Sequence, residues 1–150
     1  MHAEFGVLLV GLALLLFVTV PTHEAYEEAK RAYWTFLTTL DGTPFAAHSR
    51  PVVLTGYHSL GTGLLGYNSG KGSEITLCVN GNANSILHVL LHEFAHQSVS
   101  EYSHSKRFWS NLEDVKAHAE SVGIYKTIKN PTSICGVAVD DVRVHEPDPP

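Results

Sequence analysis

The sequence has little positive charge, and this narrows the range of its partners. Its 150 residues include ten Lys and Arg against 15 Asp and Glu, a formal net charge of -5 at pH 7. Proteins that bind nucleic acids usually carry a basic surface that displaces counterions from phosphates. A nucleic-acid partner is therefore not indicated.

Cysteine is scarce as well. Cys78 and Cys135 are the only two, and they lie far apart without a Cys-x-x-Cys spacing. This argues against a site of several thiolates and against a scaffold held by many disulfides. Two possibilities remain open. They are two separate small core residues, which we favour, or one disulfide, which would need an oxidising compartment.

Charged residues are missing from one long stretch near the N-terminus. Residues 5–20 read FGVLLVGLALLLFVTV. A helix of this length spans about 24 Å, and the flanking residues bring it near the ~30 Å of a bilayer's hydrocarbon core. We predict that residues 1–21 anchor the protein in a membrane. A cleaved signal peptide is the alternative, although no Lys or Arg precedes the run and no Ala-x-Ala-like site follows it.

The basic residues beside this segment indicate its orientation. Lys30 and Arg31 follow it in the sequence. Because Lys and Arg are enriched on the cytoplasmic side of membrane segments, they favour a cytoplasmic domain. If the segment is instead cleaved, a secreted protein is expected.

The rest of the chain fits one domain, because domains usually need roughly 100 to 150 residues. We assign it to residues 22–144. Residues 145–150 are too polar and too rich in proline to be ordered. Nothing in the sequence implies an oligomer, so a monomer is expected.

The spacing of apolar residues predicts an α+β fold that begins with a helix and a small sheet. From Thr22 to the stop at Asp41-Gly42, apolar residues recur at intervals of three and four, as in an amphipathic helix. Residues 51–57 and 74–79 are typical of strands, the second with one buried face. Residues 67–72 are interpreted as a turn between them.

Two further helices are predicted after the sheet. The first covers residues 85–99 and is preceded by Asn and Ser residues suited to capping. The second covers residues 105–122 and stops at Gly123. The expected architecture is therefore a helix, a short sheet and a pair of helices.

The pentapeptide His92-Glu93-Phe94-Ala95-His96 lies on the first helix of that pair. Residues four apart share a helix face, so both histidines can direct a ring nitrogen to one point about 2.0 to 2.1 Å away, the bond length of zinc. Glu93 points off this axis, toward a water at the metal, which suits a general base. The helix is strongly apolar, and burying unligated histidines in it would be costly. We therefore predict a zinc site.

A third ligand is needed, because catalytic zinc usually has three protein ligands and keeps the fourth position for water. His104 is our candidate, since the polar residues 100–103 can reverse the chain and bring it over the metal. Glu113 and Glu120 remain alternatives, because some catalytic zinc sites take a carboxylate from a later helix.

Four other residues could act near the site. His88 lies one turn before the first ligand on the same face, and three successive turns diverge too far to share an ion. We expect it to lie beside the site or to be partly exposed. Tyr57, Tyr67 and Tyr102 could each stabilise an oxyanion, and the sequence does not choose among them.

Three pieces of the sequence resemble WLM-domain metallopeptidases, which are related to the SprT-like and bacterial DUF45-type zincins. The first, Leu65-Gly-Tyr-Asn-Ser-Gly-Lys-Gly-Ser-Glu-Ile-Thr-Leu77, is similar to that family's Gly-Asn-Gly turn and following strand. The others are Leu90-Leu-His-Glu-Phe-Ala-His96 and His104-Ser-Lys-Arg-Phe-Trp109. The resemblance covers most of the domain, and it implies zinc ligands at His92, His96 and His104 with Glu93 as the catalytic residue.

The sequence departs from the family at two places. Seven residues separate His96 from His104, more than is usual. The chain also lacks the basic tail that directs some members to proteins crosslinked to DNA, so no substrate carries over from the resemblance.

We therefore predict a zinc metalloendopeptidase that uses one Zn²⁺ ion and hydrolyses a protein or peptide substrate. Glu93 is expected to serve as its general base. The rival hypothesis is a non-catalytic, zinc-stabilised binding module on a membrane. Glu93 discriminates between them, because a structural zinc site closes its fourth position and has no use for a base.

Overall fold

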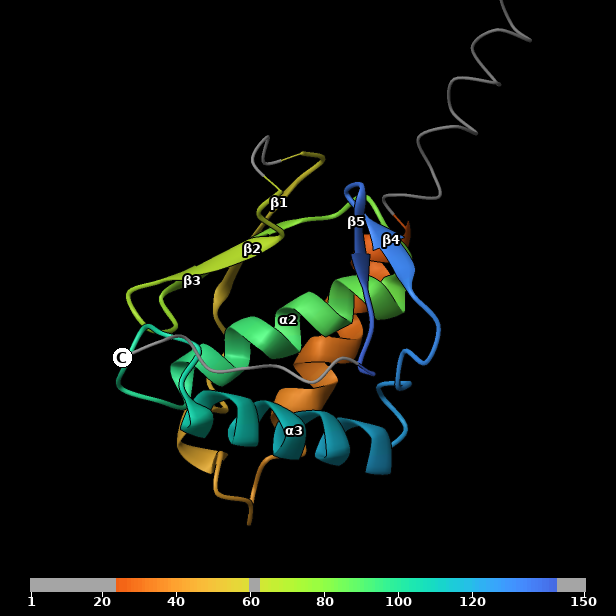
Figure 1. Cartoon of the computed structure of the whole chain (residues 1–150). Helices are drawn as coiled ribbons and strands as arrows, with labels where there is room; N and C mark the ends of the chain where they lie inside the picture. The colour runs from red at the N-terminus through yellow and green to blue at the C-terminus, as the bar shows by residue number, and fades with distance from the viewer. Residues whose placement is uncertain (1–23, 60–62, 143–150) are drawn as a thin grey trace, which may run out of the picture.

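The computed structural model describes residues 24–59 and 63–142, and Figure 1 shows their arrangement. The predicted anchor at residues 1–21 and the predicted disordered tail at 145–150 lie outside the described residues. Within the described ranges, none of the helices combines the length and apolar character that a membrane crossing needs. The sequence prediction of an α+β fold is confirmed.

The first helical segment covers residues 24–38 and supplies one wall of the core. Its apolar side is completely buried at Ala29, Tyr33 and Phe36, as the spacing of three and four residues predicts. The chain then turns at Gly42, whose φ of +74° is readily adopted only by glycine. A short 3-10 helix, η1 (Ala46–His48), leads toward the sheet.

The sheet contains β1 (Val53–Tyr57), β2 (Gly66–Ser69) and β3 (Glu74–Cys78) in the order β1-β3-β2. The central strand β3 runs parallel to β1 and antiparallel to β2. We expected one buried face on β3, but Thr76 and Cys78 are buried along with Ile75 and Leu77. A central strand covered on both faces has no solvent-exposed side, which explains the difference.

The interpretation of residues 67–72 as a turn was wrong for its first half. Residues 67–69 belong to β2 and pair with β3, and the reversal occurs over Gly70, Lys71 and Gly72, all with positive φ. β2 is short and polar, so its strand conformation comes from pairing with β3 rather than from an apolar pattern of its own.

The two later helices are α2 (Ala83–Gln97) and α3 (Lys106–Ser121), within two residues of the predicted bounds. α2 begins at Asn82, whose side chain accepts a hydrogen bond from Ser85 N at 2.8 Å. α3 begins at Ser105, whose hydroxyl accepts one from Phe108 N at 3.1 Å. Capping and apolar spacing act locally, and this is why both helices could be predicted.

α2 lies at the centre of the molecule. Figure 1 shows the three-stranded sheet on one side of it and α3 on another. The main core lies between α2, the sheet and helix 24–38, where the Phe36 and Phe94 rings meet edge to face at 5.2 Å. A smaller cluster joins α2 to α3 through Ala95, Phe108 and Leu112. The helix with the paired histidines is thus held from several sides.

A second, two-stranded sheet follows α3. It consists of β4 (Thr132–Ile134) and β5 (Val137–Val139), joined at Cys135-Gly136. The φ angles of +50° and +77° at these two residues are those of a type I′ hairpin turn. Cys135 forms a disulfide with Cys78 at the end of β3. The expectation of two separate core cysteines was therefore wrong, because no local pattern shows that the hairpin returns to β3.

Candidate metal centre

Three imidazole rings converge beside α2. His92 and His96 project from successive turns of the helix, and His104 comes from the segment between α2 and α3. The Nε2 atom of His104 lies 3.1 Å from Nε2 of His92 and 3.1 Å from Nε2 of His96. The structure thus brings together the three residues that the sequence singled out, as a group able to hold one metal ion.

The spacing of these nitrogen atoms can be compared with zinc geometry. Three ligands at the usual 2.0 to 2.1 Å from a tetrahedral zinc lie about 3.3 Å from one another. The observed 3.1 Å separations agree with this value. Burial first, and then the nearby His96 and His104 rings, hold the pKa of His92 well below its usual range. His92 is therefore neutral, as a metal ligand must be, and the three side chains fit a zinc ion.

Aromatic side chains form a wall behind the three histidines. The Phe108 ring centroid lies 4.3 Å from that of His96 and 4.8 Å from that of His104. The Trp109 ring lies 5.3 Å from the His104 ring. Both come from the first turns of α3, so the start of this helix limits the positions that the third histidine can take.

Glu93 follows the first histidine and is 5% exposed. Burial raises the pKa of its carboxyl group to about 7. The carboxylate faces β2 at Gly66, where an added Cβ atom would lie 3.3 Å from Glu93 Oε1 and 3.0 Å from Val89 Cγ1. Glycine at this position lets the strand approach α2 closely.

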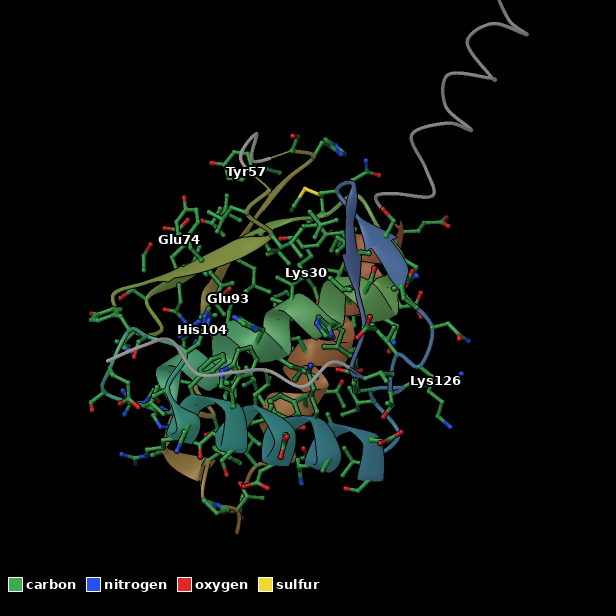
Figure 2. All side chains as sticks on the ribbon, viewed as in Figure 1. Lys30, Tyr57, Glu74, Glu93, His104 and Lys126 are labelled. Carbon is green, nitrogen blue, oxygen red and sulfur yellow. A yellow bond between two sulfur atoms is a disulfide. The ribbon has the colours of Figure 1, made fainter. Side chains whose placement is uncertain are left out.

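A cleft of about 420 Å³ opens over the histidines and Glu93. Residues 63–68 form one side, and His88 and Val89 of α2 extend the floor beyond His92. Tyr102 lies at the other end with His104. Figure 2 shows Glu93 and His104 close to each other beside α2. A ligand in this cleft therefore contacts the three histidines and the edge of the sheet together.

The side chain of Asn68 connects β2 to α2, the helix that carries His92 and His96. Its side-chain amide donates to the backbone carbonyl of Glu93 at 3.1 Å, while its Oδ1 accepts from Gly72 N at 2.7 Å. One side chain therefore closes the β2–β3 turn and fixes its distance from α2.

Lys71 holds the segment that carries the third histidine. Its ammonium group donates to the backbone carbonyls of His96 (2.9 Å), Val99 (3.0 Å) and Glu101 (2.5 Å). It also lies 4.3 Å from the centre of the Tyr102 ring. A cation at a helix C-terminus satisfies carbonyls that have no partner within the helix. No local pattern singles out Lys71, since these contacts join it to residues about 25 to 30 positions away in the sequence.

Replacing Lys71 should loosen this arrangement. We expect Lys71→Met, which keeps the length of the side chain but removes its three donors, to lower zinc affinity about tenfold, at the lower end of the range for residues that support a ligand. Competition with a zinc-binding dye measures the affinity. Lys106→Met, on an exposed residue at the start of α3, is the matched control. Equal zinc affinities in the two variants would contradict this role.

The two glutamates considered as alternative ligands lie outside the cleft, and so does one of the three tyrosines. Glu113 and Glu120 line a groove on another side of α3, away from the three histidines. Tyr57 is exposed and is not among the cleft residues, whereas Tyr67 and Tyr102 line the cleft. The two cleft tyrosines therefore remain the candidates for a role in catalysis.

The fold and the site define a class of protein. Two histidines one turn apart on a buried helix, with a glutamate after the first and a third histidine further along the chain, are characteristic of zincin-like metalloprotease domains. The WLM domain matches residues 45–140, more than half of the chain. The chain therefore belongs to the WLM-domain family. No curated protein and no solved structure matches it.

Proposed function

We propose that this protein is a zinc-dependent metallopeptidase that hydrolyses peptide bonds. The observation that carries the proposal is the buried carboxylate of Glu93 beside three convergent histidines, with all four residues lining one open cleft. Zinc, when bound, would acidify a water and polarise the scissile carbonyl.

The residues of the chain supply the remaining chemistry. Glu93 accepts the proton of the attacking water and passes it to the leaving amine. A pKa of about 7 suits both steps, because the group can exist in either protonation state near neutral pH. Asn68 keeps the Glu93 backbone in register with β2 through its hydrogen bond at 3.1 Å.

The edge of the sheet supports an extended peptide as substrate. Cys78 N donates to Leu65 O at 2.8 Å, and bonded pairs alternate along an antiparallel ladder. By this alternation the backbone groups of Gly66 and Asn68 point away from β3. In the part of the chain that the structure describes, no strand pairs with that side of β2. A substrate strand could add there, beside the histidines.

A non-catalytic zinc module remains the second candidate, and the cleft argues against it. A structural zinc site is closed by a fourth protein ligand. Among the described residues the metal-binding group consists of three histidines, and the cleft reaches it.

The first test is metal content together with activity. We expect the full-length protein in detergent to contain about one zinc per chain and to cleave unfolded casein. His104→Ala should weaken zinc binding by more than about 100-fold, exceeding what loss of a supporting residue costs. His58→Ala, at an exposed histidine outside the cleft, should change neither property. Zinc-loaded protein without proteolytic activity would leave the non-catalytic module as the better account.

A further inference from the structure

His88 lines the same cleft but is held differently from the three convergent histidines. It lies one helical turn before His92, and its side chain is 12% exposed. Its Nδ1 atom is 3.0 Å from the Tyr125 hydroxyl and 3.4 Å from Asp141 Oδ1. The ring is therefore fastened by one nitrogen to residues that follow α3.

Asp141 is the centre of this network. It accepts hydrogen bonds from Lys116 Nζ at 2.6 Å, Tyr125 OH at 2.5 Å and Ile128 N at 2.7 Å. Burial alone would raise the pKa of its carboxyl group. The nearby His88 ring and the hydrogen bonds from Lys116 and Tyr125 outweigh burial and hold this pKa well below its usual range. Asp141 is thus ionised, with Lys116 as its counter-ion.

The direction of these bonds fixes which nitrogen of His88 carries hydrogen. Tyr125 has one hydroxyl proton, and it is donated to Asp141. The contact between the Tyr125 hydroxyl and His88 must then be a bond donated by Nδ1-H. In the neutral ring, Nε2 carries the lone pair. No hydrogen bond to Nε2 occurs among the residues that the structure describes.

We propose that His88 is a substrate-positioning residue, whose Nε2 accepts a hydrogen bond from a backbone N–H of the peptide. This rests on the proposed peptidase function. Four residues of helix advance about 6 Å, which equals about two residues of an extended chain. The recognised N–H therefore belongs to a residue about two positions from the scissile bond. Tyr125, Asp141 and Lys116 hold the ring in the orientation that this contact requires.

Peptide binding to a protein that cannot cleave provides the test. A labelled ten-residue peptide is chosen around a bond that the wild-type protein cleaves in casein. Its dissociation constant is measured by fluorescence anisotropy on zinc-loaded Glu93→Gln and on Glu93→Gln/His88→Ala. We expect binding about tenfold weaker without His88, the usual cost of one hydrogen bond. His118→Ala in the same background controls for loss of a histidine, because His118 bonds to Thr39 away from the cleft.

Ester substitution identifies the bond itself. Each peptide N–H other than that of the scissile bond is replaced in turn by an ester oxygen. The peptide whose ester lies about two residues from the cleaved bond should have the same dissociation constant for the proteins with and without His88. A merely structural role would leave the His88 effect the same for every ester, and that result would overturn the proposal.

The remaining outcomes separate this proposal from the peptidase function. Cleavage by the wild-type protein with no change in affinity on loss of His88 overturns the positioning role alone. Absence of cleavage by zinc-loaded wild-type protein overturns both. Tyr125→Phe should weaken binding less than His88→Ala, because it removes the hydroxyl that orients the ring but keeps the ring itself.

Discussion

Glu93→Gln should lower kcat for peptide hydrolysis by about 10³-fold while leaving zinc bound. A general base contributes roughly 10² to 10⁴ in rate, and 10³ corresponds to about 4 kcal/mol of transition-state stabilisation. Glutamine keeps the size of the side chain but cannot accept the proton of the attacking water. Steady-state kinetics and zinc analysis on the same preparation measure the two quantities.

The fold should tolerate this replacement. Burial raises the pKa of Glu93 to about 7, so the folded protein binds this proton more tightly than the unfolded chain does. Ionisation of Glu93 therefore lowers the free energy of unfolding. This loss of stability reaches its full size only above pH 7, where the carboxyl group is fully ionised in the folded protein. In metal-free protein at pH 8, Glu93→Gln should melt at the same temperature as wild type or higher. Thermal denaturation followed by circular dichroism distinguishes a lost base from a lost fold.

Glu113→Gln is the matched control for this experiment. Glu113 is exposed on α3 and lines a groove away from the histidines. Its replacement should change neither zinc content nor kcat. If Glu93→Gln keeps wild-type activity with zinc bound, the general-base role is excluded. If it loses zinc instead, the carboxylate acts in holding the metal centre.

The helical part of the site could be read from the sequence because its signals are local. Asn82 and Ser105 cap the two helices, and each lies next to the segment that it begins. His92 and His96 come from one helix, so their common face follows from helical periodicity alone. Helical periodicity alone does not place His104, because its position beside His92 and His96 depends on the chain reversal between α2 and α3.

The residues that hold the site in place could not be predicted from the sequence, because they are distant in sequence from the residues that they contact. Lys71 reaches carbonyls at the end of α2, and Asn68 reaches one in the middle of it. Both lie in a hairpin whose first strand has no apolar alternation. Asp141, which holds His88 through the Tyr125 hydroxyl, lies far along the chain, beyond α3. Such contacts exist only once the chain has folded.

The disulfide is the clearest case of such a distant contact, and breaking it should have the largest effect on stability. Cys78 and Cys135 are 57 residues apart in sequence. Closing a loop of this length removes entropy from the unfolded chain equivalent to about 4 kcal/mol. We expect Cys78→Ala/Cys135→Ser to lower the free energy of unfolding by about this amount, measured by urea denaturation under non-reducing conditions.

The disulfide stabilises the fold but lies outside the cleft that contains Glu93 and the three histidines. It joins the end of β3 to the β4–β5 turn, and neither cysteine lines the cleft. At temperatures where the double variant remains folded, its kcat should therefore equal that of wild type. A wild-type protein treated with reductant should show the same loss of stability. If reduction lowers kcat in the folded protein, the hairpin acts on the site, and the separation of stability from catalysis fails.

The same bond bears on the compartment in which the domain works. Lys30 and Arg31 favoured a cytoplasmic domain, whereas disulfides persist mainly in oxidising compartments. We propose that the domain lies on the oxidising side, because a bond worth about 4 kcal/mol is a large part of the stability of a small domain. Because Cys78 is completely buried, labelling is done on denatured protein. With and without prior reduction, thiol labelling should detect both cysteines only after reduction. If the cysteines are labelled without reduction, the proposal is wrong, and the cytoplasmic side favoured by Lys30 and Arg31 is the better assignment.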